Sequence, residues 1–475
     1  MSYNLTTMQS IYHGQDEIVE ITYNGSSIYH KSSGPDYTEP FYVENTSNEN
    51  ETLNIVKNDD RAPTLTIEYS TDKTVWNTFG TTSTTALTRT LQAGDKLYLR
   101  CSTNSWYASY SYNTITGVSK VGGNIMSLLY GSNFTGQETN FPSESTNNLF
   151  LLFYNNTRLI DASNLLLPAT TLAESCYTGM FFGCTALTTA PELPATTLAN
   201  GCYQQMFYGC TSLTTAPALP ATTLATYCYN NMFYGCTSLT SAPALPATTL
   251  AQSCYDSMFN GCTSLTSAPA LPATTLAQSC YNNMFSGCTS LTSAPALPAT
   301  TLADYCYQSM FDGCTSLTTA PALPATTLAE SCYSGMFYNC TSLTSAPALP
   351  ATTLADSCYD EMFYGCTSLT TAPELPATTL ADYCYQSMFN GCTELTTAPE
   401  LPATTLADSC YQSMFDGCRS LNNVKCLAEN GFDSGDPTYT WLDGVADDGT
   451  FVKKSGVSWE SGEDGIPYTW SVIEV

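Results

Sequence analysis

Cysteine thiols are the most numerous reactive groups in this sequence. The chain has 22 cysteines, and twenty of them form pairs eight residues apart, such as Cys176 and Cys184, that recur every 26 residues. A cysteine nucleophile needs a neighbouring base, and the two histidines, His13 and His30, lie far from these pairs in the sequence. A zinc site needs closely clustered ligands, and pairs at this spacing without CxxC or histidine do not supply them. We therefore expect the thiols to stack as small buried hydrophobic groups, with disulfides between repeats as the alternative.

Carboxylates are the second candidate chemistry, and they concentrate in the last three repeats. Asp356, Asp382 and Asp408 share one repeat position and could offer oxygen ligands to Ca²⁺. The interpretation that we favour is that they lie near a helix N-terminus, where the helix dipole stabilises negative charge. Asp360 and Glu361 are adjacent, but a glycosidase needs two carboxylates about 5 to 10 Å apart on either side of a bound sugar. We expect no catalytic residue, no enzymatic activity, no metal site and no required cofactor.

A 26-residue repeat positions these groups. Ten near-identical units run from residue 169 to about residue 428, and the first is ATTLAESCYTGMFFGCTALTTAPELP. Residues 172–184 place Cys176, Tyr177, Met180 and Phe181 on one side of a helical wheel, and the positions that vary between units on the other. The pattern predicts an amphipathic helix in each unit.

The ends of this segment also carry helix signals. Thr171 and Glu174 have the spacing of a capping box. Gly183 stands where a helix ends in a left-handed residue, and the seventh unit has Asn339 there, the other residue that tolerates positive φ. After the helix we expect a short strand at residues 187–190, followed by an extended corner at the two prolines.

The repeat pattern C-x-x-L-x-x-A-x-x-L-P followed by L-A-x-x-C-Y-x-x-M-F-x-G-C resembles the BspA-like, Treponema-type leucine-rich repeat. This resemblance implies an α/β solenoid in which each unit completes the core of its neighbours. It also implies a role in adhesion, since such repeats occur in bacterial surface proteins and in phage proteins.

The variable positions of the repeat are candidates for recognition. They mix tyrosine with Ser, Asn, Gln and Asp, which is the composition of adaptable binding surfaces. Two alternatives remain open: drift at unconstrained exposed positions, and binding of a periodic ligand such as a glycan to the Thr/Ser-rich strand face. The predicted ligand-binding residues are Tyr208, Tyr227, Tyr234, Asp304, Tyr305, Tyr338, Tyr364 and Tyr383.

The regions outside the repeats divide the chain further. Residues 1–33 form a predicted β-hairpin module around Asn24-Gly25, and this module resembles those at the start of phage structural proteins. Residues 34–145 read as a β-sandwich-like domain, with strand-like runs at 64–69, 75–79, 85–91 and 96–101. The solenoid then covers 146–428, with a degenerate N-terminal cap at 146–168. Residues 429–475 read as a small β-rich C-terminal cap.

Charge and hydropathy restrict the partners. The net charge is −28, and residues 169–418 contain no Lys or Arg, so nucleic acid is a poor partner. No run of about 18 apolar residues and no export signal is present, so we expect no membrane insertion. The predicted function is attachment to a host cell-surface protein or glycan by a phage virion appendage, a tail or head fibre-like protein, with the N-terminal β region contacting other virion proteins. The alternative is a bacterial cell-surface adhesin; homo-oligomer formation stays open.

Overall fold

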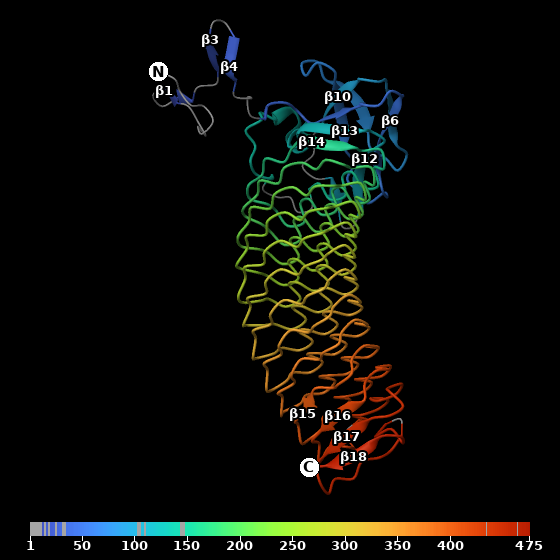
Figure 1. The fold of residues 1–475 in the computed structure, drawn as a ribbon. Coiled ribbons are helices and arrows are strands. Elements are labelled where there is room, and N and C mark those ends of the chain that lie inside the picture. Colours follow the sequence, from blue (N-terminus) through green and yellow to red (C-terminus); the bar gives the residue numbers. More distant parts are fainter. Residues whose placement is uncertain are drawn as a thin grey trace.

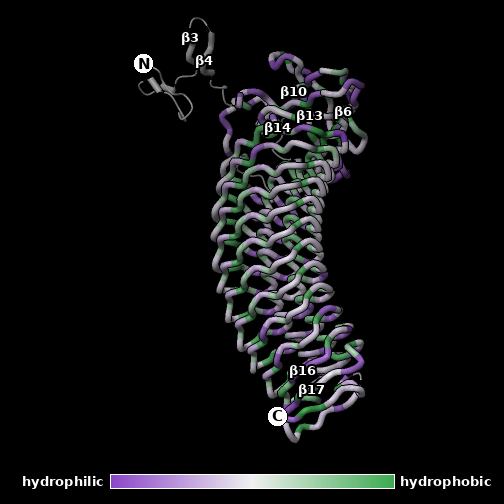
Figure 2. Tube along the Cα trace, viewed as in Figure 1, coloured by the Kyte–Doolittle hydropathy of each residue, from purple (hydrophilic) through white to green (hydrophobic). Residues whose placement is uncertain are grey.

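The computed structural model shows a long, gently bowed rod of stacked coils with β-sheets at both ends (Figure 1). It describes residues 35–101, 106–108, 111–142, 148–433, 435–462 and 464–475, together with the backbone of four short strands between residues 12 and 30. Figure 2 shows hydrophobic and hydrophilic stretches that recur from one coil to the next, as expected of a repeat that stacks in register.

Two sheets form the N-terminal end of the rod. The larger sheet has the strand order β14-β13-β5-β10-β7-β8, and the smaller has the order β11-β12-β6-β9. Their strands are β5 (Tyr42–Glu44), β6 (Glu51–Lys57), β7 (Thr66–Ser70), β8 (Asn77–Thr81), β9 (Leu87–Leu91), β10 (Lys96–Cys101), β11 (Tyr107–Ala108), β12 (Ser111–Thr116), β13 (Lys120–Asn124) and β14 (Asp161–Leu166). A short helix α1 (Ser127–Tyr130) and a 3-10 turn η2 (Gly131–Asn133) follow β13.

The strand predictions for this region are confirmed at β7 to β10, each within a few residues of the predicted range. The hairpin prediction is confirmed by β3 (Glu20–Tyr23) and β4 (Ser26–His30), which pair antiparallel with Tyr23 opposite Ser26. Asn24 and Gly25 themselves lie outside the described residues. A second small pair is formed by β1 (Tyr12–His13) and β2 (Asp16–Glu17).

The predicted helix at residues 172–184 is wrong. No helix occurs between residues 148 and 433, all of which are described. Residues 172–184 instead form a chain of consecutive turns, as do the equivalent residues of each later unit, and we call this side of the stacked coils the turn wall. Every second residue makes a turn hydrogen bond, as from Thr178 N–H to Ser175 C=O. The residues between donate to the next coil instead, as from Tyr177 N–H to the carbonyl of Cys202. The coils are therefore joined by the backbone bonds that a helix would have kept within itself.

Left-handed residues at every fourth position make this conformation possible. Ser175, Gly179 and Gly183 have φ of 51°, 59° and 71°. The positive φ predicted for Gly183 and Asn339 is confirmed, although these residues close turns and do not end helices. Thr171 and Glu174 are consequently not a capping box. The apolar pairs Cys176-Tyr177 and Met180-Phe181 lie four residues apart. A short helix and a repeat of four-residue turns both place residues at this spacing on one side.

The predicted strand at residues 187–190 is also wrong in extent. Between residues 167 and 399, coils pair on this side only through isolated bridges, such as Thr215 with Ser241. The two prolines that follow in each unit have no N–H to donate, so a longer ladder cannot form. At the C-terminal end, where the repeat sequence changes, the bridges widen into a parallel sheet. Its order is β15 (Glu400–Leu401), β16 (Asn423–Cys426), β17 (Thr450–Lys453) and β18 (Ser471–Glu474).

The core consists of columns of identical side chains. Consecutive Phe rings such as Phe233 and Phe259 stack with centroids 5.6 Å apart and planes within 4° of parallel. A parallel tyrosine column includes Tyr229 and Tyr255, 5.7 Å apart. All of these rings are buried, so each coil buries its apolar side only because two neighbours cover it. The column extends into the predicted N-terminal cap, where Phe153 stacks on Phe181.

Candidate functional site

The repeat cysteines lie inside the turn wall. All 22 cysteines are free and buried, and burial raises the pKa of thiols such as Cys236, to about 12. In the second cysteine of each pair the thiol donates to a carbonyl of the preceding coil, as from Cys236 to Phe207 at 3.1 Å. A thiol held neutral and away from solvent is a poor nucleophile and a poor metal ligand. These cysteines therefore pack the core, and they carry no candidate site.

The shared aspartate position has a structural use. The Asp382 carboxylate accepts the backbone N–H of Asp408 in the next coil at 3.1 Å, and Asp304 does the same for Glu330 at 3.2 Å. These acids thus hold adjacent coils together, which replaces the helix-dipole interpretation. Among the described residues, no group of three or more His, Cys, Asp or Glu side chains is placed to hold a metal ion.

The eight predicted binding residues lie on the outer surface of the turn wall: seven tyrosines in two groups, and Asp304 beside one of them. Tyr208, Tyr234, Tyr338 and Tyr364 share one repeat position and form two stacked tyrosine pairs whose nearest members lie four coils apart. Tyr208 and Tyr234 lie 4.6 Å apart, and Tyr338 and Tyr364 lie 4.5 Å apart, with planes within 5° of parallel. Within each pair the two rings cover each other's facing sides, and Tyr208 also stacks on Phe182.

Tyr227, Tyr305 and Tyr383 form the second group, which we call the outer tyrosine row. They occupy one repeat position at intervals of three coils, and their φ values are 55°, 59° and 57°. Tyr227 and Tyr383 are 40% and 42% exposed, whereas serine at the same position is buried in some coils, as at Ser253, and half-buried in others. Serine and tyrosine take the same left-handed backbone at this position, and the tyrosines differ in projecting a large ring from the surface.

Tyr305 differs from the other members of the row. Its hydroxyl donates to the carboxylate of Glu330 at 2.5 Å, and this bond is the main reason that the pKa of Tyr305 is raised. Asp304, next to it, is exposed and accepts the Glu330 backbone N–H. The predicted residues Asp304 and Tyr305 therefore belong to one hydrogen-bonded cluster.

Sequence reasoning missed the environment of Asp360, which lies between the two tyrosine groups along the coil. Burial, and then the neighbouring Glu361 carboxylate, raise the pKa of Asp360 to about 7. One of its carboxylate oxygens is buried and has no hydrogen-bond partner among the described residues. Asp312 faces the same cluster and contributes to a raised pKa of Glu361. No sequence signal distinguishes Asp360 from the exposed acids, because its burial depends on the coils at either side.

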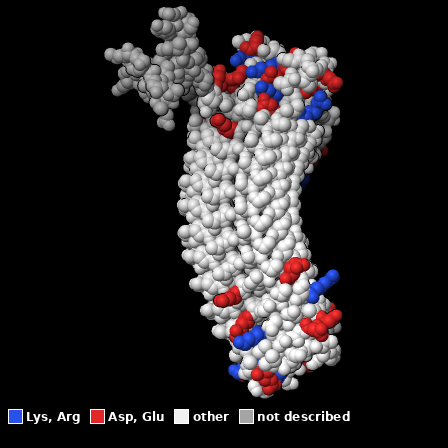
Figure 3. Space-filling model, in the orientation of Figure 1, with Lys and Arg blue, Asp and Glu red and all other residues white. Residues whose placement is uncertain are grey.

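On the face drawn in Figure 3, charged side chains gather at the two ends of the rod. The face drawn in Figure 3 is uncharged over most of the solenoid's length. The turn wall, in contrast, carries acidic side chains such as Asp304, Glu330 and Asp382 among its hydroxyl, amide and aromatic groups, and it has no Lys or Arg between residues 169 and 418. No described helix has both the length and the apolar character needed to cross a membrane.

The repeats match the family model of the BspA type leucine rich repeat region. Six copies of that model match, over residues 152–292, 226–359 and 330–431, which together span more than half of the chain. The chain belongs to the BspA-type leucine-rich repeat family. No curated protein matches the chain. The family match confirms the resemblance drawn from the repeat pattern, and it covers the two stacked tyrosine pairs and the outer tyrosine row of this BspA-type protein.

Proposed function

We propose that this chain is a non-enzymatic binding protein of the adhesion type, and that the outer tyrosine row contacts its ligand. The observation that carries the proposal is the exposure of Tyr227 and Tyr383 in left-handed backbone on a rigid frame. Tyrosine supplies a large, stiff contact area at low entropic cost, and the surrounding Ser, Asn and Asp side chains supply hydrogen bonds.

The ligand class we propose is a host cell-surface protein or glycan. A surface that combines hydroxyl, amide and aromatic groups with carboxylates, and that has no Lys or Arg between residues 169 and 418, suits polar ligands and gives no advantage to phosphate-rich ones. The two stacked tyrosine pairs add further aromatic and hydroxyl groups to the same surface.

For the particle that carries the protein, we propose a phage virion, with the solenoid as an appendage attached through the N-terminal β region. The likeness of residues 1–33 to hairpin modules of phage structural proteins supports this choice. The bacterial cell-surface adhesin is the alternative, and the BspA-type family favours it. Mass spectrometry of purified virions and of washed cell envelopes separates the two, since detection only in envelopes would contradict the virion.

Repeat-matched substitutions test the binding surface. Tyr227, Tyr305 and Tyr383 are replaced together by Ser, the residue that neighbouring coils carry at the same position, as at Ser253. We expect loss of retention on intact bacterial cells and on an array of bacterial surface glycans, with unfolding unchanged.

The matched control is a set of alanine substitutions at Thr266, Thr292 and Thr318, on the Thr/Ser-rich side of the coils. Retention that persists in the tyrosine variant and is lost in the threonine variant would assign binding to the threonine side and contradict the proposal.

A further inference from the structure

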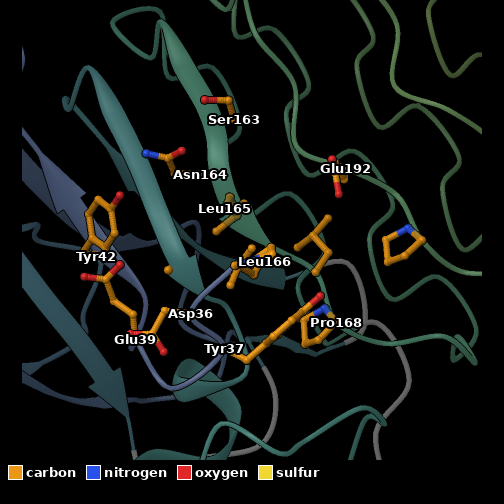
Figure 4. A pocket seen from close by; sticks show the side chains of 14 residues that line it. Asp36, Tyr37, Glu39, Tyr42, Ser163, Asn164, Leu165, Leu166, Pro168 and Glu192 are labelled. Atoms are coloured by element: carbon orange, nitrogen blue, oxygen red, sulfur yellow. The ribbon is translucent and has the colours of Figure 1, made fainter. Parts of the chain in front are cut away.

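A cavity lies where the N-terminal sheets meet the first coils of the solenoid. Its volume is about 310 Å³, and it is lined by the segment before β5, by β14 and by the first repeat (Figure 4). Pockets that hold small organic groups begin at about this size. Its apolar lining includes Leu165, Pro168 and Pro194. Three separate parts of the chain therefore build one recess.

Hydrogen bonds from Asn124 fix the backbone segment that carries Tyr37. The side-chain amide of Asn124 on β13 donates to the backbone carbonyl of Tyr37 at 2.9 Å, and the Asn124 backbone N–H donates to the backbone carbonyl of Glu39 at 2.8 Å. The Tyr37 side chain extends toward Pro168 along one side of the cavity, and it is 43% exposed (Figure 4). The backbone that carries the Tyr37 ring is thus held in place, and the ring is accessible to a ligand.

The charge of the lining has one sign. Asp36, Glu39 and Glu192 line the cavity, and no Lys or Arg does. Glu39 is neutralised by Lys96, whose ammonium lies 2.9 Å from its carboxylate. The Thr38 hydroxyl and N–H hold the pKa of Asp36 below its usual range. Glu192 is exposed, and within the described part of the chain neither Glu192 nor Asp36 forms a salt bridge, so their negative charge is compensated less than that of Glu39.

We propose that this cavity binds a guanidinium or ammonium group carried on an apolar stem. The stem would cover the leucine and proline lining, while the cation would lie near Tyr37 and the carboxylates of Asp36 and Glu192. Anions are repelled by the same carboxylates. The cation comes either from an arginine or lysine side chain of a bound peptide or from a free amine.

A neighbouring hollow favours the peptide. It has a volume of about 440 Å³, shares Ser163, Glu192 and Pro194 with the first cavity, and continues over Pro217 and Pro220 of the next coil. An extended segment with its cationic side chain in the first cavity would therefore find a continuous apolar path for its backbone.

The repeat supplies a matched pair of variants. Most coils carry alanine at the position of Glu192, as at Ala218, so Glu192→Ala restores the common residue and is compatible with the fold. Glu374 occupies the same position in a distant coil, so Glu374→Ala is the control. Tyr37→Leu removes the aromatic ring while keeping an apolar side chain.

Calorimetric titration of the full chain is the test, with the peptide acetyl-Ala-Ala-Arg-Ala-Ala-amide, its citrulline counterpart and ethylguanidine as probes. We expect the arginine peptide to bind at least tenfold more tightly than the uncharged citrulline peptide, with Glu192→Ala weakening it about tenfold. Glu374→Ala should have no effect, and Tyr37→Leu should weaken binding severalfold.

Equal binding of the arginine and citrulline peptides, or unchanged binding by Glu192→Ala, would overturn the proposal. Tighter binding of the peptide than of ethylguanidine would assign the site to a peptide side chain, and the reverse to a free amine. The cavity is separate from the outer tyrosine row, so either result leaves the proposed adhesion function to its own test.

Discussion

The inner and outer sides of the turn wall differ in how much their side chains vary between coils. On the inside, each coil places the same Cys, Tyr, Met and Phe side chains, and each ring stacks on identical rings above and below. On the outside, the outer tyrosine row alternates with serine at one repeat position without a change of backbone, as Tyr227 and Ser253 have φ of 55° and 49°. The residue types of the interior are thus constrained by contacts with neighbouring coils, whereas the exterior positions can change residue type without a change of backbone and can therefore evolve to bind a ligand.

The largest expected difference between the two sides is chemical reactivity. In the folded protein the repeat thiols should react with a thiol reagent roughly a hundredfold or more slowly than after denaturation, because they are buried and neutral. Denaturation without reductant should then release 22 free thiols. A count far below this would show disulfides between coils and would contradict the stacked thiols.

Truncation of an interior ring tests the dependence of one coil on the next. Phe259→Ala removes a buried ring that stacks on Phe233 and Phe285, and it should lower the free energy of unfolding by about 3–5 kcal/mol. Urea unfolding measures this change. Asn260→Ala, the adjacent outward residue, is the control and should cost much less; comparable losses would mean that inside and outside are not energetically distinct.

Asp360 occupies an outward-facing repeat position but is partly buried, and its contribution to the stability of the fold should depend on pH. Its folded-state pKa of about 7 lies above the ordinary value of 3.8. The stabilising contribution of its proton is therefore complete below about pH 4 and is lost as the pH rises to about 7. Asp360→Asn should stabilise the protein by about 1–2 kcal/mol at pH 8 and by little at pH 4. Thermal unfolding against pH checks this, with the exposed Asp356→Asn as control.

The smallest effect on the free energy of unfolding is expected for substitutions in the outer tyrosine row. Tyr227→Ser should change the free energy of unfolding by no more than about 0.5 kcal/mol, because the ring is largely exposed and Ser253 adopts the same backbone. Tyr208→Asn should cost about 1 kcal/mol more, since Tyr208 stacks on Phe182 and Tyr234. Equal costs in denaturant unfolding would remove the distinction between the two groups of tyrosines.

The sequence predicted the repeat, its family, its buried residues and several N-terminal strands, because these depend on composition and local pattern. Cys176, Tyr177, Met180 and Phe181 were assigned to the interior and are fully buried. The helix was wrong because a four-residue turn repeat buries the same residues. Residues at left-handed positions, such as Ser175 and Gly179, are poor helix formers and were the available signal against a helix.

By itself, the sequence determined which side chains face inward and which vary outward, since the repeated units show this through their differences. The tertiary structure decided where the backbone hydrogen bonds go: Tyr177 N–H bonds to the next coil, which no single unit contains. It also decided that Asp360 becomes partly buried and that Tyr37 and Glu192 share a cavity. These outcomes depend on residues distant in sequence, and local pattern carries no information about them.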